Sequence, residues 1–116
     1  MSHGQHLVVD LAGVAVSLLE DPQRMGALLE RLAADCGLTI CSGPHLVPFT
    51  PVGLTGFVVL KESHVAFHTY PEDHAMALDL YSCAPVPRQR VLATLREVLR
   101  PTRMRSRLIR RRSPAP

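Results

Sequence analysis

Residues 55–70 read TGFVVLKESHVAFHTY, and this stretch decides the fold. Two runs rich in β-branched and aromatic residues flank a polar pair at positions 61 and 62, which is the pattern of two antiparallel strands joined by a tight turn. We place the strands at residues 55–60 and 63–70. Because proline cannot continue a hydrogen-bonded strand, the second one ends at Pro71.

Two amphipathic helices are expected, one before and one after this hairpin. Asp21 caps the first, Pro22 opens it and Gly37 stops it, with apolar residues at helical spacing between them. Pro87 opens the second, which ends before Pro101. Further strands are expected at residues 6–11, 39–41, 76–81 and 103–109, and a loop at 42–53, which holds three prolines and two glycines.

This order of elements predicts the fold class. Strands in hairpin series with two amphipathic helices are typical of an α+β two-layer sandwich, in which an antiparallel sheet carries both helices on one face. A chain of 116 residues fits one such domain, residues 1–116. With 47% apolar residues it has enough apolar side chains to fold around a core.

Composition also bears on where the protein works. No apolar run is long enough for a membrane helix, and the first residues do not have the pattern of a secretory signal. The three cysteines are an odd number without a CxxC pair, so neither a disulfide framework nor a structural zinc site is expected. We expect a cytoplasmic protein with reduced thiols and no membrane partner.

Basic charge is concentrated at one end of the chain. Ten of the thirteen basic residues lie from Arg88 onward, most densely at residues 103–112. Such a run can bind nucleic-acid phosphates, but no aromatic residues are interleaved with it to stack on bases. We therefore expect residues 103–116 to form a solvated last strand and a basic tail, and a nucleic-acid partner is not expected.

Reactive side chains gather around the hairpin. Ser63 lies where the turn meets the second strand, and its hydroxyl can act as a nucleophile if a base is near. His64 and His68 are candidates for that base, and the Cys83 thiol for a nucleophile or a proton donor. Two carboxylates can orient a histidine, those of Glu72 and Asp79.

The histidines leave three interpretations open. His64 and His68 share one face of an extended strand, but His74 lies beyond Pro71 and no fixed ligand pattern appears, so a metal site is not expected. Histidines that are merely hydrogen-bonded in a small polar patch remain an alternative to catalysis. Ser63 and His68 have opposite parity, so they can meet only if the strand bends or bulges; otherwise His68 acts on an intermediate that reaches round the strand end.

A family resemblance adds to this. Residues 56–72, followed by LDLYSC at 78–83, resemble the self-processing segment of the bacterial and archaeal S-adenosylmethionine decarboxylase proenzymes, whose pattern is close to E-S-H-x-x-x-H-T-[WY]-P-E and then D-x-[FY]-[ST]-C. Residues 49–56 and 6–10 resemble the family's approach to this segment and its opening strand. The likeness is strong between residues 49 and 83 and weak beyond 88.

The resemblance implies a pyruvoyl enzyme. The proenzyme would cut itself between Glu62 and Ser63 into a β chain, residues 1–62, and an α chain, residues 63–116, and Ser63 would become the pyruvoyl group. This ketone forms a Schiff base with the substrate amine and supplies the electron sink for decarboxylation, with no pyridoxal phosphate and no metal. The product would be the aminopropyl donor for spermidine synthesis.

The resemblance also implies roles for individual residues. His68 assists processing together with the hydroxyl of Thr55, and Cys83 is the proton donor to the substrate carbon. The substrate pocket is lined by an aromatic pair and a carboxylate: Phe49, Tyr70 and Glu72. The family usually assembles as a homodimer of αβ units.

Two alternatives stay open. The same scaffold allows decarboxylation of L-ornithine or L-arginine, and departures from the family pattern at Lys61 and at residues 73–76 and 84–85 bear on the substrate. A non-catalytic paralogue that binds a partner subunit or nucleic acid through its arginine-rich end is the other alternative, although Ser63, His68 and Cys83 would then have little reason to occur together.

Overall fold

The predicted hairpin lies inside a six-stranded antiparallel sheet. The computed structural model describes residues 3–115. β3 (Leu54–Leu60) and β4 (Ser63–Tyr70) pair in regular register from Thr55 opposite His68 to Leu60 opposite Ser63. The sheet order is β2-β3-β4-β5-β1-β6, and the other strands are β1 (Gly4–Ala12), β2 (Ile40–Pro48), β5 (Ala75–Ser82) and β6 (Arg103–Arg111).

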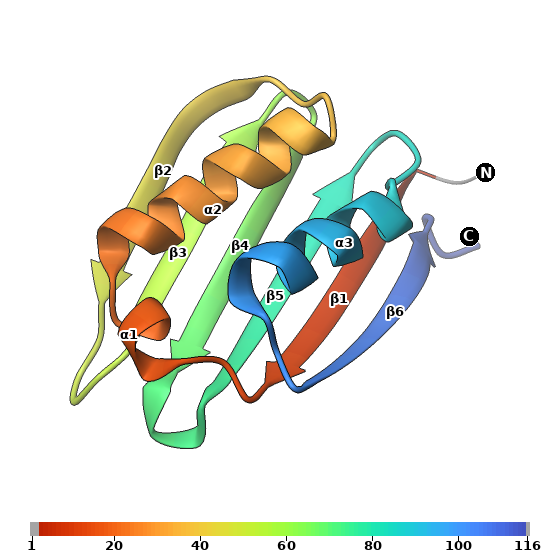
Figure 1. The fold of residues 1–116 in the computed structure, drawn as a ribbon. Coiled ribbons are helices and arrows are strands. Elements are labelled where there is room, and N and C mark those ends of the chain that lie inside the picture. Colours follow the sequence, from red (N-terminus) through yellow and green to blue (C-terminus); the bar gives the residue numbers. More distant parts are fainter. Residues whose placement is uncertain (1–2, 116) are drawn as a thin grey trace.

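Both long helices cover the same face of this sheet (Figure 1), which confirms the predicted α+β two-layer sandwich. α2 (Pro22–Asp35) begins as expected, because the Asp21 carboxylate accepts the backbone N–H groups of Gln23 at 3.0 Å and Arg24 at 3.1 Å. α3 (Arg88–Leu99) ends before Pro101. A short helix, α1 (Val16–Leu19), and a 3-10 turn, η1 (Pro71–Asp73), were not expected as elements.

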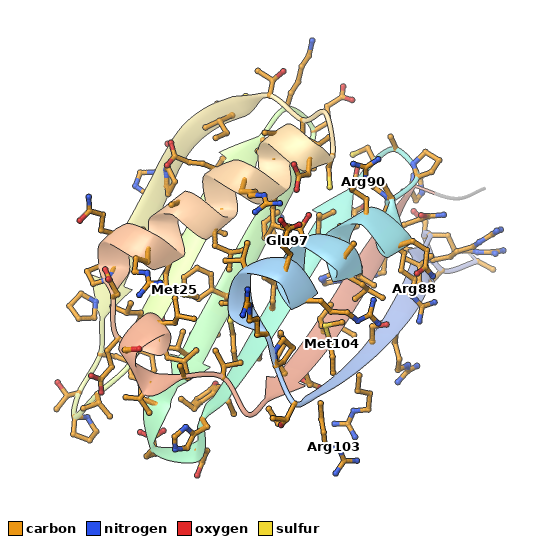
Figure 2. All side chains as sticks on the ribbon, in the orientation of Figure 1. Met25, Arg88, Arg90, Glu97, Arg103 and Met104 are labelled. Carbon is orange, nitrogen blue, oxygen red and sulfur yellow. The ribbon has the colours of Figure 1, made fainter. Side chains whose placement is uncertain are left out.

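The core lies between the sheet and these helices. Met25 of α2 and Met104 of β6 lie in this layer, whereas Arg103 points away from it (Figure 2). The Phe67 ring packs directly over Gly56 of the neighbouring strand, and a Cβ at position 56 would overlap it. The sheet therefore has one face buried by helices, as the alternation of residues 76–81 predicted.

The opposite side of the sheet, which we call the open face, has no helix on it among residues 3–115. Phe57 and Val59 of β3 lie on it and are 37% and 38% exposed. Small side chains, Ala66 and Ala77, alternate with polar ones along β4 and β5. Exposed apolar side chains on a sheet face that no helix covers are typical of an interface.

The predicted loop at residues 42–53 is wrong in its first half. β2 runs from Ile40 to Pro48, with register shifts between Ile40 and Ser42 and between Ser42 and His45. It is an edge strand, and an irregular edge strand tolerates prolines because one side of it needs no hydrogen bonds. β6 is the other edge, and its arginines are solvent-exposed as predicted.

None of the helices formed by residues 3–115 is both long enough and apolar enough to cross a membrane.

Candidate active site

The bond between positions 62 and 63 lies in the turn from β3 to β4. Glu62 adopts a left-handed backbone conformation, with φ at 62°. For a residue with a side chain this conformation costs about 1–2 kcal/mol relative to the right-handed one. The residue whose carbonyl the serine would attack is therefore held in a strained conformation.

The Glu62 carbonyl oxygen has a defined partner. It accepts the backbone N–H of Cys83 at 3.2 Å. The loop after β5 that presents this N–H is itself fixed, since Ser82 Oγ accepts the N–H of Ala84 at 3.1 Å and Gln5 Oε1 accepts the N–H of Val86 at 2.8 Å. An N–H aimed at this oxygen stabilises negative charge that develops on it during attack at the carbonyl carbon.

The Ser63 hydroxyl oxygen is buried and has no hydrogen-bond partner anywhere in residues 3–115. Leaving such a group unpaired costs about 1–3 kcal/mol. In the sheet Ser63 lies between Leu60 and Ser82, both of them buried. No side chain among residues 3–115 of one copy is therefore in place to accept the serine proton.

The remaining predicted site residues form a second cluster. Thr55 and His68 face each other across β3 and β4, and the Thr55 hydroxyl is hydrogen-bonded to His68 Nδ1 at 2.8 Å. The Phe49 ring lies 6.5 Å from that of His68 and 6.4 Å from that of Tyr70, measured between centroids. Glu72 follows in η1 and is exposed.

The two clusters lie at opposite ends of β4. Its pairing with β3 and β5 shows neither a bend nor a bulge, so Ser63 and His68 point to opposite faces of the sheet. Five residues of strand separate them by about 16 Å. The bend that would have let His68 serve Ser63 directly within one chain is absent.

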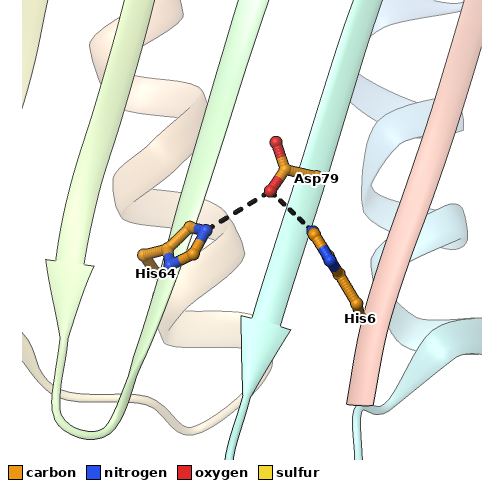
Figure 3. A group of neighbouring side chains, drawn as sticks. All are labelled: His6, His64 and Asp79. Carbon is orange, nitrogen blue, oxygen red and sulfur yellow. Dashed lines mark hydrogen bonds and ion pairs between the residues drawn. The ribbon is translucent and has the colours of Figure 1, made fainter. Parts of the chain in front are cut away.

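A third group of polar side chains lies on the open face near the turn (Figure 3). Asp79 Oδ2 is 2.9 Å from His6 Nε2 and 3.3 Å from His64 Nε2. His64 is stacked on Tyr81, with ring centroids 6.1 Å apart. The sequence indicated that Asp79 could orient a histidine, but it did not single out His6, which joins the group only through the pairing of β1 with β5.

These three ligand atoms lie within 4.8 Å of one another, a spacing that could hold a metal ion. The protonation of His6 opposes that use. Arg111 Nη1 is 3.0 Å from His6 Nδ1, and because arginine can only donate, the neutral ring carries its proton on Nε2 and donates it to Asp79. The histidine nitrogen that would face a metal therefore has no free lone pair.

The cysteines differ in character. Cys83 and Cys41 are exposed, and Cys36, the C-cap residue of α2, is half-buried against the core. Burial raises the pKa of the Cys36 thiol, and the neighbouring Asp35 charge raises it further. Cys36 is therefore a packing residue, whereas the Cys83 side chain is accessible next to the candidate cleavage site.

Comparison with known proteins decides the family. Residues 5–112 match the S-adenosylmethionine decarboxylase family. This chain belongs to that family. An S-adenosylmethionine decarboxylase proenzyme 2 from Bacillus cereus is 40% identical over 114 residues, covering 92% of this chain and 88% of the relative. The proenzyme from Thermoplasma acidophilum is 37% identical and covers 91% and 81%.

A further relative and a crystal structure extend the comparison within the S-adenosylmethionine decarboxylase family. The proenzyme from Symbiobacterium thermophilum is 42% identical over 82 residues, a match that spans 71% of this chain and 61% of that protein. The adenosylmethionine decarboxylase from Aquifex aeolicus superposes with a TM-score of 0.83 at 30% identity, covering 95% of this chain and 91% of that one. Family and fold are thus shown together.

Proposed function

We propose that this protein is a proenzyme that cleaves itself between Glu62 and Ser63 and then decarboxylates S-adenosylmethionine. The hydrogen bond from the Cys83 N–H to the Glu62 carbonyl oxygen carries the proposal, because it polarises the peptide bond that must be attacked. The same peptide follows a strained residue and precedes an unpaired hydroxyl. The relatives are named as proenzymes of this decarboxylase.

Cleavage proceeds through the side chain of Ser63. Its oxygen attacks the Glu62 carbonyl carbon, and the resulting oxyanion accepts the Cys83 N–H. When the C–N bond breaks, the amide becomes an ester between Glu62 and the serine oxygen. Removal of the Cα proton of residue 63 then expels the Glu62 carboxylate, which frees the β chain and leaves dehydroalanine. Addition of water and loss of ammonia convert dehydroalanine into a pyruvoyl group.

The residues around position 63 fit such a group. The buried Ser63 oxygen has no hydrogen-bond partner, as expected at a position whose side chain is later converted into another group. The exposed thiol of Cys83 lies directly after β5. The pyruvoyl group supplies the electron sink for loss of carbon dioxide. We assign Cys83 the protonation of the substrate carbon afterwards, since a thiol can donate a proton near neutral pH.

We further propose that the active protein is a homodimer of αβ units that pack through their open faces. Phe57 and Val59 on that face remain 37% and 38% exposed in the single chain. A two-fold axis that lies between the two open faces, perpendicular to the strands, places the C-terminal end of β4 in one copy against the N-terminal end of β4 in the other. Phe49, Thr55, His68, Tyr70 and Glu72 of one copy would then lie against the turn that carries residue 63 in its partner. There they act on the ester and on the cleaved chain end, because the uncut Ser63 hydroxyl points to the helix-covered face.

In this arrangement the residues at the C-terminal end of β4 assist both cleavage and substrate binding. His68, oriented by the Thr55 hydroxyl, takes the Cα proton at the elimination step. The aromatic rings of Phe49 and Tyr70 stack on the adenine, and Glu72 accepts the ribose hydroxyls. The three free cysteines are in keeping with a reducing cytoplasm, where we place the enzyme.

Intact-mass measurement of the purified protein tests the cleavage. We expect two fragments, residues 1–62 and 63–116, the second with a blocked N-terminus, and a single folded chain for Ser63→Ala. Release of carbon dioxide from S-adenosylmethionine, L-ornithine and L-arginine then tests the substrate. A wild-type chain that stays whole after long incubation refutes the cleavage, and release from ornithine or arginine alone refutes the substrate.

A further inference from the structure

We infer that Asp79 is a positioning residue: by binding His64, it holds the beginning of the α chain in place once the bond between residues 62 and 63 has been cut. This inference rests on the proposed self-cleavage. It assigns a task to the group formed by His6, His64 and Asp79, which neither the cleavage chemistry nor the substrate pocket uses.

Cleavage removes a restraint from β4. In the uncut chain, the turn at residues 61 and 62 connects the first residue of β4 to β3. After the cut, residue 63 is a chain end, and the ends of strands fray unless they are tied down. The next side chain, that of His64, is then the first one able to anchor the strand.

His64 is held by two contacts on the open face. Its Nε2–H donates to Asp79 Oδ2 at 3.3 Å, because a carboxylate can only accept. Its ring lies nearly parallel to that of Tyr81, at an interplanar angle of 21°. Both partners belong to β5, which the cleavage does not interrupt. The backbone of residue 63, one bond away, is thereby kept in its strand register.

Asp79 is fixed independently of β4. The same oxygen, Oδ2, accepts the Nε2–H of His6 in β1 at 2.9 Å. Arg111 of β6 donates to the other nitrogen of that ring and lies over Tyr81, 5.9 Å from its centroid. Since β1, β5 and β6 all stay intact, the carboxylate remains in place when the start of β4 becomes a chain end.

A matched pair of variants tests this. Asp79→Ala removes the anchor. Asp10→Ala is the control. Asp10 is also on the open face and also accepts a hydrogen bond from an arginine of β6, Arg105, at 3.3 Å, but it lies toward the C-terminal end of β1, away from the cleavage site. Each variant is made in the wild-type chain, which cleaves, and in the Ser63→Ala chain, which does not. Amide hydrogen exchange over residues 64–66 is followed by mass spectrometry.

We expect Asp79→Ala to raise exchange over residues 64–66 about tenfold in the cleaved protein and to leave it nearly unchanged in the Ser63→Ala chain, because a hydrogen bond to a charged group is then lost next to a chain end. In the cleaved protein kcat should fall by a similar factor, with a smaller change in KM, while the Asp10→Ala control stays at wild-type values. His64→Asn, which keeps a donor, should lose less than His64→Ala.

The outcomes separate this inference from the proposed function. Equal exchange in cleaved wild type and cleaved Asp79→Ala overturns the inference. An equal rise in the cleaved and Ser63→Ala backgrounds also overturns it, because Asp79 would then support the sheet in general. Absence of cleavage in the wild type overturns the proposed function itself. If Asp79→Ala does not fold, the two His64 variants decide the question with the same readout.

Discussion

Two variants that are inactive alone should restore cleavage to each other. Ser63→Ala has no nucleophile, and His68→Ala has no base for the elimination. Within one chain the two residues are about 16 Å apart along β4 and on opposite faces of the sheet. If His68 serves the Ser63 of a second copy, a mixed dimer has one complete site, formed by Ser63 of the His68→Ala chain and His68 of the Ser63→Ala chain.

The expected yield follows from two-fold symmetry. Chains expressed together in equal amounts pair at random, so about half of the His68→Ala chains have a Ser63→Ala partner and can be cleaved, while no Ser63→Ala chain can. Tags of different mass on the two chains allow intact-mass measurement to count each fragment. Each variant expressed alone gives the background.

A mixture that is cleaved no more than the His68→Ala chain alone would refute the assembly, because a site formed within one copy is absent from every chain in it. Cleavage of the Ser63→Ala chain would refute the assignment of the nucleophile. Size-exclusion chromatography of the mixture checks that mixed dimers form. The result therefore distinguishes a wrong assembly from a wrong nucleophile.

Three further results are expected. Cys83→Ala should still be cleaved, because the hydrogen bond to the Glu62 carbonyl comes from the backbone N–H of residue 83, but its decarboxylation rate should fall about 100-fold or more, measured as carbon dioxide release. The Thr94 hydroxyl, which donates to Asp35 at 2.6 Å, holds the pKa of that carboxyl below its usual value. Stability from this bond is full above about pH 4 and is lost as the pH falls through the lowered pKa, so Thr94→Val should flatten the acid side of the unfolding profile in urea. Gly56→Ala should lower the free energy of unfolding by about 1–3 kcal/mol, seen as a lower Tm, because its Cβ meets the buried Phe67 ring.

The elements that depend on nearby residues were predictable. The hairpin followed from two apolar runs around a polar pair, and the start of α2 followed from Asp21 and Pro22, whose capping geometry is local. The faces of β4 and β5 followed from parity alone, including the opposition of Ser63 and His68. For these features sequence neighbours supply most of the determining contacts.

β2 was misjudged for a reason that lies outside its own segment. Its three glycine and proline residues within 43–48 indicate a loop, and nothing local overrides that indication. The strand forms because β3 offers a free edge, and its edge position with two register shifts accommodates the prolines. A sequence pattern cannot reveal that a neighbouring edge is unpaired.

The contacts of the candidate site were also not predictable from the sequence, because they join residues that are far apart along the chain. Residue types and family resemblance indicated Glu62, Ser63 and Cys83, but the contact from the Cys83 N–H to the Glu62 oxygen depends on how β5 pairs with β4. His6 joins Asp79 through a strand at the other end of the chain. Such contacts depend on register, which composition and spacing along the chain do not specify.

The distance between the Ser63 cluster and the His68 cluster explains how cleavage can depend on assembly. One copy of the chain already strains Glu62, polarises its carbonyl and buries the Ser63 hydroxyl without an acceptor, yet it keeps His68 at the far end of the same strand. A base in the same chain would allow the nascent protein to complete its cleavage before its sheet is complete. If a second copy supplies His68, which acts at the elimination step, the ester at Ser63 is not eliminated until the open faces meet, and release of the β chain follows folding and assembly in that order.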